Sequence, residues 1–295
     1  MWTQEFDLHS HSVHSDGIHK VDEVAKMMKQ SQVKFWALTD HDTISGWNEA
    51  RIAANENQIN FIPGVEITCE PGLDAEKEEL ARMNRERASK SWHLLAYFPT
   101  FSDSNEGIEK FEQWLLPLQE GRLPRMKKMI EKLSELGMPV PLEKVLEKAS
   151  GSVGRPHLAE VMVEMGYVES KSEAFELWIG DGLPAHQIQP KPSISEAAKV
   201  VHSLGGFVSL AHPLYYGISP LNLINFCNKN GVDSIEAFHG SHPDSYRFEL
   251  WTKAAENGIS ITCGSDFHGN TNGHTPGFMP VPKKQLNEQL LTSSQ

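Results

Sequence analysis

Seven short apolar segments, separated by stretches of helical periodicity, constrain the fold of this chain more than any other feature. The segments that read as strands lie at Glu5–His9, Phe35–Thr39, Phe61–Ile67, Trp92–Phe98, Gly206–Ala211, Val232–Phe238 and Ile259–Cys263. Between the first two, apolar residues recur at helical spacing at Val21, Val24, Ala25 and Met28. Ser193 and Glu196 form a capping-box pattern, which predicts the start of another helix. This alternation predicts a parallel α/β sheet, open or closed into a barrel.

The interval from Ser102 to Pro192 breaks the alternation, because it reads as several helices in succession. Its apolar stripes comprise Ile108, Phe111, Leu115 and Leu118, then Met126, Met129, Ile130, Leu133 and Leu136, and then Leu158, Val161, Met162 and Met165. Pro156 stands where a helix that starts after Gly154-Arg155 has its first residue. We therefore predict a sheet or barrel in two parts, residues 1–101 and 193–295, with a helical insertion at 102–192.

Length and composition indicate a globular protein with a large core. Of the 295 residues 39% are hydrophobic, but no apolar run reaches the roughly 18 residues that a membrane span requires. The segment Met1–Asp7 has neither the basic start nor the apolar stretch of a signal peptide. The three cysteines, Cys69, Cys227 and Cys263, are far apart and not in CxxC spacing, which argues against a disulfide framework. We therefore expect a soluble, cytoplasmic protein without membrane contacts.

The net charge limits the partners that we expect. The chain has 27 Lys and Arg against 39 Asp and Glu, a formal charge of -12. Nonspecific binding of long duplex nucleic acid rests on many cationic contacts to phosphates, so we exclude it. A small molecule or a short nucleic acid with a few phosphates remains possible. Nothing in the sequence indicates an obligate protein partner.

Residues of the kinds that bind metals follow most of the predicted strands. His9 and His11 are spaced to point to the same side of a strand. The set at the strand ends comprises His9, His11, Asp16, Asp40, His41, Asp42, Glu66, His93, His212, Asp266 and His268, with Glu236 and His239 at an ambiguous sixth end. Each alone is compatible with an ordinary polar residue, but buried imidazoles and carboxylates are costly unless they are paired or bind a metal. Because sheets and barrels of this class collect their chemistry at the carboxyl ends of the strands, the set predicts a metal site.

The same residues carry a resemblance to a known family. The motifs, in order, are Asp-Leu-His-Ser-His (7–11), Ser-Asp-Gly (15–17), Leu-Thr-Asp-His-Asp-Thr (38–43), Ile-Pro-Gly-Val-Glu-Ile (62–67), Leu-Ala-His-Pro (210–213) and Gly-Ser-Asp-Phe-His-Gly (264–269). Together they resemble the polymerase and histidinol phosphatase (PHP) superfamily, and most closely its bacterial phosphoesterases with a helical insertion. Some of these remove the 3′-phosphate from nucleoside 3′,5′-bisphosphates, and others trim short RNA from its 5′ end. The resemblance implies a distorted (β/α)7 barrel and three divalent ions, often Mn, Fe or Zn.

Carried over by position, the resemblance assigns the nine ligands to three ions. The first ion would be bound by His9, His11, Glu66 and Asp266, the second by Glu66, His93 and His212, and the third by Asp16, His41 and His268. In the implied mechanism, a hydroxide between the first two ions attacks phosphorus in line with the leaving oxygen. Asp266 takes part at this centre, and His41, His268 or a metal-bound water donates the proton to the leaving group.

Substrate recognition is expected from the insertion. The run Gly154-Arg155-Pro156-His157 resembles an Arg-Pro-His element of these phosphoesterases, and an Arg at the start of a helix can clamp phosphate. We expect Arg155 and His157 to contact the substrate, with Arg125 and Arg122 as weaker candidates. A second phosphate held there, away from the metals, would favour bisphosphates over simple monoesters. We place His239 and His242 at the rim of the site, and we expect a helix or a loop at Ala75–Lys90.

Three functions are compatible with this sequence. The first is a metal-dependent phosphoesterase for nucleoside 3′,5′-bisphosphates or for short oligoribonucleotides with a 5′-phosphate. The second is a phosphatase for a small metabolite such as histidinol phosphate, which the long insertion with Arg155 disfavours. The third is a metal-binding regulatory module without catalysis, against which the complete ligand set argues. A binuclear amidohydrolase also begins with His-x-His, but it normally bridges its ions through a carbamylated Lys, and no Lys stands at a suitable strand end.

Overall fold

A seven-stranded sheet forms the centre of the molecule. The computed structural model describes residues 1–71, 91–99, 105–149, 153–269, 275–277 and 279–292, and the sequence prediction for Ala75–Lys90 lies outside them. The strands follow one another in the order β2 (Phe6–Asp7), β3 (Phe35–Leu38), β4 (Asn60–Cys69), β5 (Trp92–Tyr97), β6 (Phe207–Leu210), β7 (Ser234–His239) and β8 (Ser260–Gly264). All seven predicted strands are therefore present.

The expectation of an entirely parallel sheet is wrong for β5. This strand pairs antiparallel with both β4 and β6, whereas the other neighbours are parallel. The sequence could not reveal this, because a buried apolar run has the same pattern in either direction. The reversal matters for function: it brings the start of β5, with His93, to the edge where the other strands end.

Backbone hydrogen bonds between the two ends of the chain close the sheet. The amide of Leu8 donates to the carbonyl of Cys263 over 3.0 Å, and the amide of Asp266 donates to the carbonyl of His9 over 2.8 Å. A third bond of 2.9 Å joins the amide of His11 to the carbonyl of Phe267. The predicted distorted seven-stranded barrel is confirmed, and its closure places the first and last sequence motifs side by side.

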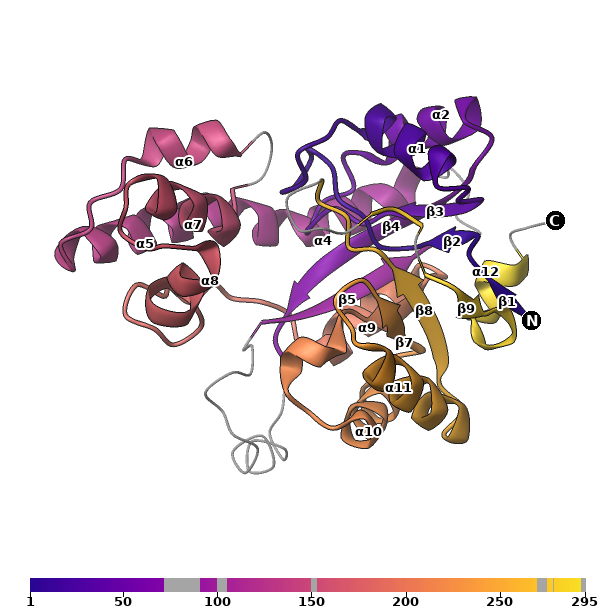
Figure 1. The fold of residues 1–295 in the computed structure, drawn as a ribbon. Helices are drawn as coiled ribbons and strands as arrows, with labels where there is room; N and C mark the ends of the chain where they lie inside the picture. The colour runs from indigo at the N-terminus through magenta and orange to yellow at the C-terminus, as the bar shows by residue number, and fades with distance from the viewer. Residues whose placement is uncertain (72–90, 100–104, 150–152, 270–274, 278, 293–295) are drawn as a thin grey trace.

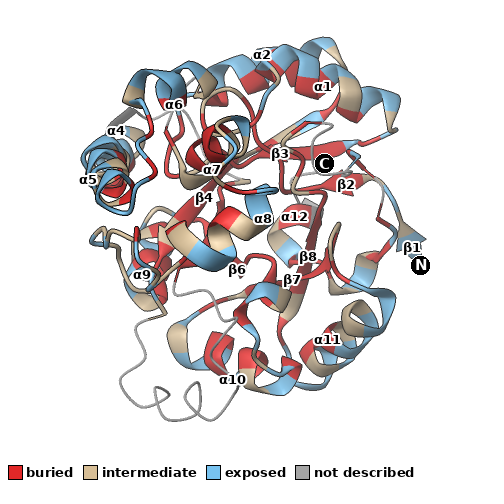
Figure 2. Ribbon diagram, turned by 60° about the vertical axis from the view of Figure 1, so that its left-hand side comes forward, coloured by how far each residue is buried: buried red, intermediate tan, exposed pale blue. Residues whose placement is uncertain are grey.

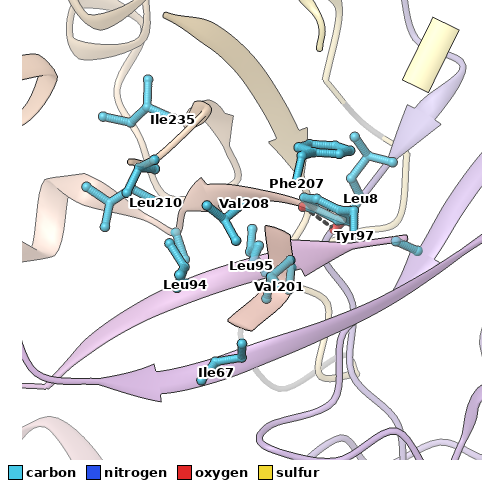
Figure 3. Close-up of a cluster of buried hydrophobic side chains, with 14 of the residues drawn as sticks. Leu8, Ile67, Leu94, Leu95, Tyr97, Val201, Phe207, Val208, Leu210 and Ile235 are labelled. Carbon is cyan, nitrogen blue, oxygen red and sulfur yellow. Dashed lines mark hydrogen bonds between the residues drawn. The ribbon is translucent and has the colours of Figure 1, made fainter. Parts of the chain in front are cut away.

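Apolar side chains of the sheet form a large buried cluster. Figure 3 shows part of it, in which Leu95 of β5 and Phe207 and Val208 of β6 lie together with Ile67 of β4 and with Leu8, which follows β2. The hydroxyl of Tyr97 donates to the carbonyl of Leu8 over 2.8 Å, so its one polar atom is satisfied. Burial of each large side chain stabilises the fold by about 1.5–3 kcal/mol, and this core supports the strand ends above it.

Helices cover the barrel from outside (Figures 1 and 2). On one side lie α1 (Val21–Gln30) and α2 (Trp47–Glu56), and on the other α9 (Ile194–Ser203), α10 (Pro220–Asn230) and α11 (Asp244–Glu256). The predicted capping box is present, since Ser193 Oγ accepts from the amide of Glu196 and the Glu196 carboxylate accepts from the amide of Ser193. Near the termini, β1 (Trp2–Thr3) pairs with β9 (Val281–Pro282), and α12 (Glu288–Thr292) lies beside them.

The predicted helical insertion contains helices in succession. They are α4 (Asn105–Glu120), α5 (Arg122–Glu135), α6 (Leu142–Lys148), α7 (Arg155–Glu164), α8 (Lys171–Ala174) and the π-helical turn η1 (Phe175–Ile179). The apolar side chains from Met126 to Ala185 form a cluster of their own, whereas Phe111 and Leu115 of α4 join the barrel core. Pro156 is the second residue of α7, one position later than expected. The segment boundaries at 101/102 and 192/193 remain predictions.

Two sequence expectations concern features outside the site. The described part of the chain contains no helix with the length and apolarity that crossing a bilayer requires. The thiols of Cys69, Cys227 and Cys263 are free and buried, and burial raises the pKa of each.

Candidate metal centre and substrate cavity

The carboxylate of Glu66 lies at the centre of the site. It projects from β4 and is almost completely buried. Its Oε1 is 2.8 Å from Nδ1 of His93 and 2.9 Å from Nε2 of His212. Its Oε2 is 3.1 Å from Nδ1 of His41 and 3.2 Å from Nε2 of His11. One carboxylate therefore faces imidazoles from several strand ends, in the bridging position that the sequence predicts for it.

The structure brings together the four residues predicted for the first ion. Nε2 of His9 lies 3.4 Å from Oε2 of Glu66 and 3.3 Å from Oδ1 of Asp266. Nε2 of His11 lies 3.3 Å from the same Asp266 oxygen. These donor atoms come from the segment after β2, from β4 and from the segment after β8, which barrel closure makes adjacent.

The second predicted group is equally compact. Nδ1 of His93 is 3.2 Å from Nε2 of His212, and both nitrogens lie within 3 Å of Oε1 of Glu66. His93 was the ligand with the least support in the sequence, because no motif surrounds it. The antiparallel direction of β5 explains how a residue at the start of a strand reaches this edge.

Asp16 organises the third predicted group. Its Oδ1 is 3.2 Å from Nε2 of His268, and its Oδ2 is 3.6 Å from Nε2 of His41. The Nδ1–H of His268 donates to the carbonyl of Asp266 over 3.0 Å, which leaves Nε2 with a lone pair that faces Asp16. All nine sequence-predicted ligands thus lie in one continuous cluster.

These residues fit divalent metal ions. Several of their buried polar atoms have no hydrogen-bond partner among the described residues, including Nε2 of His9 and of His11, Nδ1 of His41, Oδ1 of Asp16 and Oε2 of Glu66. Such atoms are costly to bury without a partner. Imidazole nitrogens combined with carboxylate oxygens suit Zn, Mn and Fe, so ions would satisfy the atoms that the protein leaves unsatisfied.

The pKa values of the clustered side chains also indicate a site for cations. Burial opposes protonation of His9 and His11, but the surrounding carboxylates outweigh it and raise the pKa of His9 well above its usual value and that of His11 to about 10. Burial opposes ionisation of Glu66 and Asp266, yet nearby imidazoles lower the pKa of both carboxyls well below the usual range. The site therefore keeps negative charge that either protons or metal cations neutralise, and the two compete.

The backbone is strained at the site. Asp42, His212 and Asp266 have positive φ angles of 56°, 27° and 54°, a region that residues other than glycine rarely adopt. Each follows the end of a strand of the barrel. Strain of this kind persists only where the surrounding structure holds it, and it is typical of functional sites.

A buried carboxylate shapes the loop between His11 and Asp16. Oδ1 of Asp40 accepts a hydrogen bond from the amide of Ser12 over 2.8 Å and from the Ser15 hydroxyl over 2.5 Å, and its Oδ2 accepts from the Ser12 hydroxyl over 2.7 Å. Asp40 therefore acts as a support for the loop that carries ligands of two predicted ions.

Three residues near the sixth strand end lie deeper in the site than the sequence predicts or indicates. Glu236 is fully buried, and its Oε1 lies 2.9 Å from Nδ1 of His9. His239, expected at the rim, is also fully buried, with Nε2 3.3 Å from Oδ2 of Asp266, and His242 beside it is buried as well. A bulge in β7 between Glu236 and Phe238 explains the error, because an extra residue shifts the alternation of side chains.

A cavity leads from the cluster to the predicted insertion. From the barrel, Asp16, His41 and His93 line one end. The basic side chains along its wall are Arg122, Arg125, Arg155 and Lys191. The three arginines are sequence-predicted candidates, whereas Lys191 is not, because it lies between Pro190 and Pro192 without any recognisable motif.

The basic side chains are only partly neutralised by acidic ones. Arg155 Nη1 donates to Oδ1 of Asp181 over 2.8 Å, and Arg122 pairs with Asp42. Burial, together with neighbouring cations, lowers the pKa of Arg125 to about 10 and that of Lys191 to about 8. Neighbouring cations that lower one another's pKa repel each other, and a bound anion relieves this repulsion.

His157 occupies a different environment from Arg155. Its buried Nδ1 accepts a hydrogen bond of 3.0 Å from the amide of Gly154, which stabilises the start of α7. The part of this turn that lines the cavity is Gly154, Arg155 and Pro156. His186 also contacts the carboxylate that pairs with Arg155, since its Nε2 lies 3.1 Å from Oδ1 of Asp181.

Comparisons with known proteins agree with this architecture. Residues 7–135 match the PHP domain. The chain is 29% identical over 272 residues to a 5′-3′ exoribonuclease of Haemophilus influenzae, with 90% of each chain covered. It is 28% identical over 291 residues to a 3′,5′-nucleoside bisphosphate phosphatase of Chromobacterium violaceum, with 93% of each covered.

A solved structure supports the same assignment. A candidate metal-dependent phosphoesterase of Bifidobacterium adolescentis superposes with a TM-score of 0.77 at 28% identity, over 97% of this chain and 95% of the other. The resemblance that the sequence motifs carry to the PHP phosphoesterases is therefore confirmed. Residues 7–135 thus match a PHP domain, and over most of its length the chain is similar to metal-dependent phosphoesterases that share its fold.

Proposed function

We propose that this protein hydrolyses phosphate esters of nucleotides, namely the 3′-phosphate of nucleoside 3′,5′-bisphosphates, short oligoribonucleotides with a 5′-phosphate, or both. The observation that carries the proposal is the cavity that joins the cluster around Glu66 to Arg122, Arg125, Arg155 and Lys191. A substrate with two phosphates fits this arrangement, with one phosphate at the cluster and the other among the basic side chains. The relatives named for bisphosphate and RNA hydrolysis support the same substrate class.

At the reacting end, the nine predicted ligands would hold the divalent ions. When bound, such ions supply an activated water and neutralise charge on the phosphate oxygens. Glu66 presents one oxygen to each of two ligand groups, and Asp16 and Asp266 anchor the others. Of the two histidines proposed as proton donors to the leaving group, His41 lines the cavity.

At the recognition end, the basic side chains would bind the phosphate that is not hydrolysed. Arg155 stands at the first position of α7, where its guanidinium and the positive end of the helix favour the same anion. Its pairing with Asp181 fixes the guanidinium from one side, and the ring of Phe175 lies 5.6 Å below it. Arg125 and Lys191 line the same cavity and add to this positive surface. His157 would act by holding the turn that presents Arg155.

A comparison of substrates tests the proposed function. With Mn present, we expect phosphate release from adenosine 3′,5′-bisphosphate or mononucleotide release from a 5′-phosphorylated short RNA, and slower turnover of histidinol phosphate. Faster turnover of histidinol phosphate than of either nucleotide would support the small-metabolite phosphatase instead. No turnover of any of the three with Mn, Fe or Zn would overturn the enzyme proposal in favour of a metal-binding module.

The substitution Arg155→Ala is expected to raise KM for adenosine 3′,5′-bisphosphate by about tenfold to a hundredfold. Loss of one charge-assisted contact to phosphate corresponds to about 1.5–3 kcal/mol. Because the ligand cluster is unchanged, kcat should fall less than kcat/KM, and the KM for a simple monoester such as p-nitrophenyl phosphate should barely change. Steady-state kinetics on both substrates measure the difference.

A matched variant controls for general effects of removing an arginine. Arg51→Ala changes an exposed arginine on α2, outside the cavity that carries Arg155. This variant should have the wild-type kcat and KM for both substrates. If Arg155→Ala left the kinetics of the bisphosphate unchanged, the second phosphate would bind elsewhere, even if the metal chemistry remained intact.

A further inference from the structure

Glu236 holds ligands of two different predicted ions at once. Its Oε1 accepts from Nδ1 of His9 over 2.9 Å, and its Oε2 accepts from the amide of His212 over 2.7 Å. His9 belongs to the first predicted group and His212 to the second. Glu236 itself has no exposed surface, so both contacts are made in a fully buried environment.

The contact with His9 determines which ring nitrogen is available. An ionised carboxylate only accepts hydrogen bonds, so His9 must carry its proton on Nδ1. When the ring is neutral, its Nε2, which faces Glu66 and Asp266 at 3.4 and 3.3 Å, has the free lone pair that a metal ion requires. A carboxylate behind a metal-binding histidine orients the ring and fixes its tautomer in this way.

The contact with His212 supports a strained backbone. His212 has φ 27° and ψ 55°, and it precedes Pro213, which further disfavours helical backbone angles. Its amide would lack this buried partner if Glu236 were removed. The hydrogen bond therefore stabilises the turn that directs Nε2 of His212 to Oε1 of Glu66.

Strand β8 packs closely against the Glu236–His9 pair because it has a glycine at position 264. A side-chain carbon at Gly264 would lie 2.1 Å from Cβ of His9 and 2.9 Å from Oε1 of Glu236. Only glycine fits there, so β8 approaches closely enough to enclose the Glu236–His9 pair.

We propose that Glu236 is a positioning residue that fixes the tautomer of His9 and the turn at His212, and thereby sets the metal affinity of the centre. The inference rests on the proposed function, since it assumes that the cluster binds ions. A carboxylate is required because both of its oxygens accept. The amide of Gln accepts at one end only and would present a donor to either His9 or His212.

The test uses Glu236→Gln with Zn²⁺ as the probe. We expect the apparent affinity of this variant for Zn²⁺ to be tenfold to hundredfold weaker, measured by competition with a chromophoric chelator. We also expect mass spectrometry of the purified variant to show fewer bound ions per chain. The control is Thr262→Val on the neighbouring strand β8, which removes a buried 2.7 Å hydrogen bond to Ser209. This control should lower thermal stability without changing the affinity for Zn²⁺.

A second measurement needs no variant of Glu236. In the Zn²⁺-loaded wild-type protein, ¹⁵N spectra of labelled histidine should show His9 protonated on Nδ1, with the signal assigned by its absence in His9→Asn. A proton on Nε2 of His9, or wild-type affinity in a folded Glu236→Gln protein, would overturn the inference alone. If the wild-type protein took up no Zn²⁺, Mn²⁺ or Fe²⁺, the proposed function itself would fail.

Discussion

Replacing Glu66 by Gln is expected to lower kcat/KM for phosphate-ester hydrolysis by at least about a thousandfold, which corresponds to roughly 4 kcal/mol. Gln keeps the size of the side chain but removes the charge that faces His93 and His212 on one oxygen and His41 and His11 on the other. The proposed bridge between two ions is then lost. Initial rates with Mn and adenosine 3′,5′-bisphosphate, together with the metal content of the purified variant, measure the effect.

A change of Glu to Gln on the barrel surface serves as the control. Glu49 lies on α2 and is largely exposed, and its partner is His14, which is not one of the nine predicted ligands. Glu49→Gln should therefore retain full activity and metal content. The role given to Glu66 would be contradicted if Glu66→Gln folded, as judged by circular dichroism, and still hydrolysed the substrate at more than a tenth of the wild-type rate.

Removal of divalent ions with a chelator is expected to abolish hydrolysis and to lower the melting temperature. Ions that bind only the folded state, at a free concentration of about 100 times their dissociation constant, add about 2.7 kcal/mol to the free energy of unfolding. For a chain of 295 residues the loss of about 2.7 kcal/mol corresponds to roughly 4 °C in Tm. The physical reason is that the buried carboxylates of Glu66, Asp16 and Asp266 would lose their main counter-charges. Differential scanning calorimetry before and after chelation measures the shift.

Restoration with Mn²⁺ distinguishes specific binding from general damage by the chelator. Both activity and Tm should return in the wild-type protein, whereas the Tm of Glu66→Gln should respond much less to either treatment. A wild-type Tm that is the same with and without chelator would show that the cluster does not hold ions under these conditions.

The sequence already contained most of the candidate site. The nine predicted ligands belong to a larger set of imidazoles and carboxylates at the ends of the apolar segments. The resemblance to the PHP phosphoesterases selects them from that set, and the structure brings all nine together. Glu66 is a clear example, since the Pro-Gly-Val-Glu run places a carboxylate in a strand where an unpaired charge would be costly. Such patterns involve only residues that are close in sequence, so they can be recognised without the structure.

Other parts of the site depend on contacts between distant residues. The direction of β5 could not be predicted, although it decides how His93 reaches Glu66. Because of the bulge in β7, His239 lies in the buried cluster and not at the rim, where the sequence predicts it. Lys191 joins Arg125 and Arg155 only because the chain returns from the predicted insertion to the barrel beside them.

The sequence alone predicted the identity of the elements, the resemblance to the PHP phosphoesterases and the residue types of the site, because periodicity and sequence motifs are local properties of the chain. Only the tertiary structure decided which atoms face one another. The closure of β2 against β8 makes Asp266 a neighbour of His9, and the burial of Glu236 between His9 and His212 makes it a support for both. Barrel closure and strand register are set by packing between segments far apart in sequence, so no local pattern specifies them.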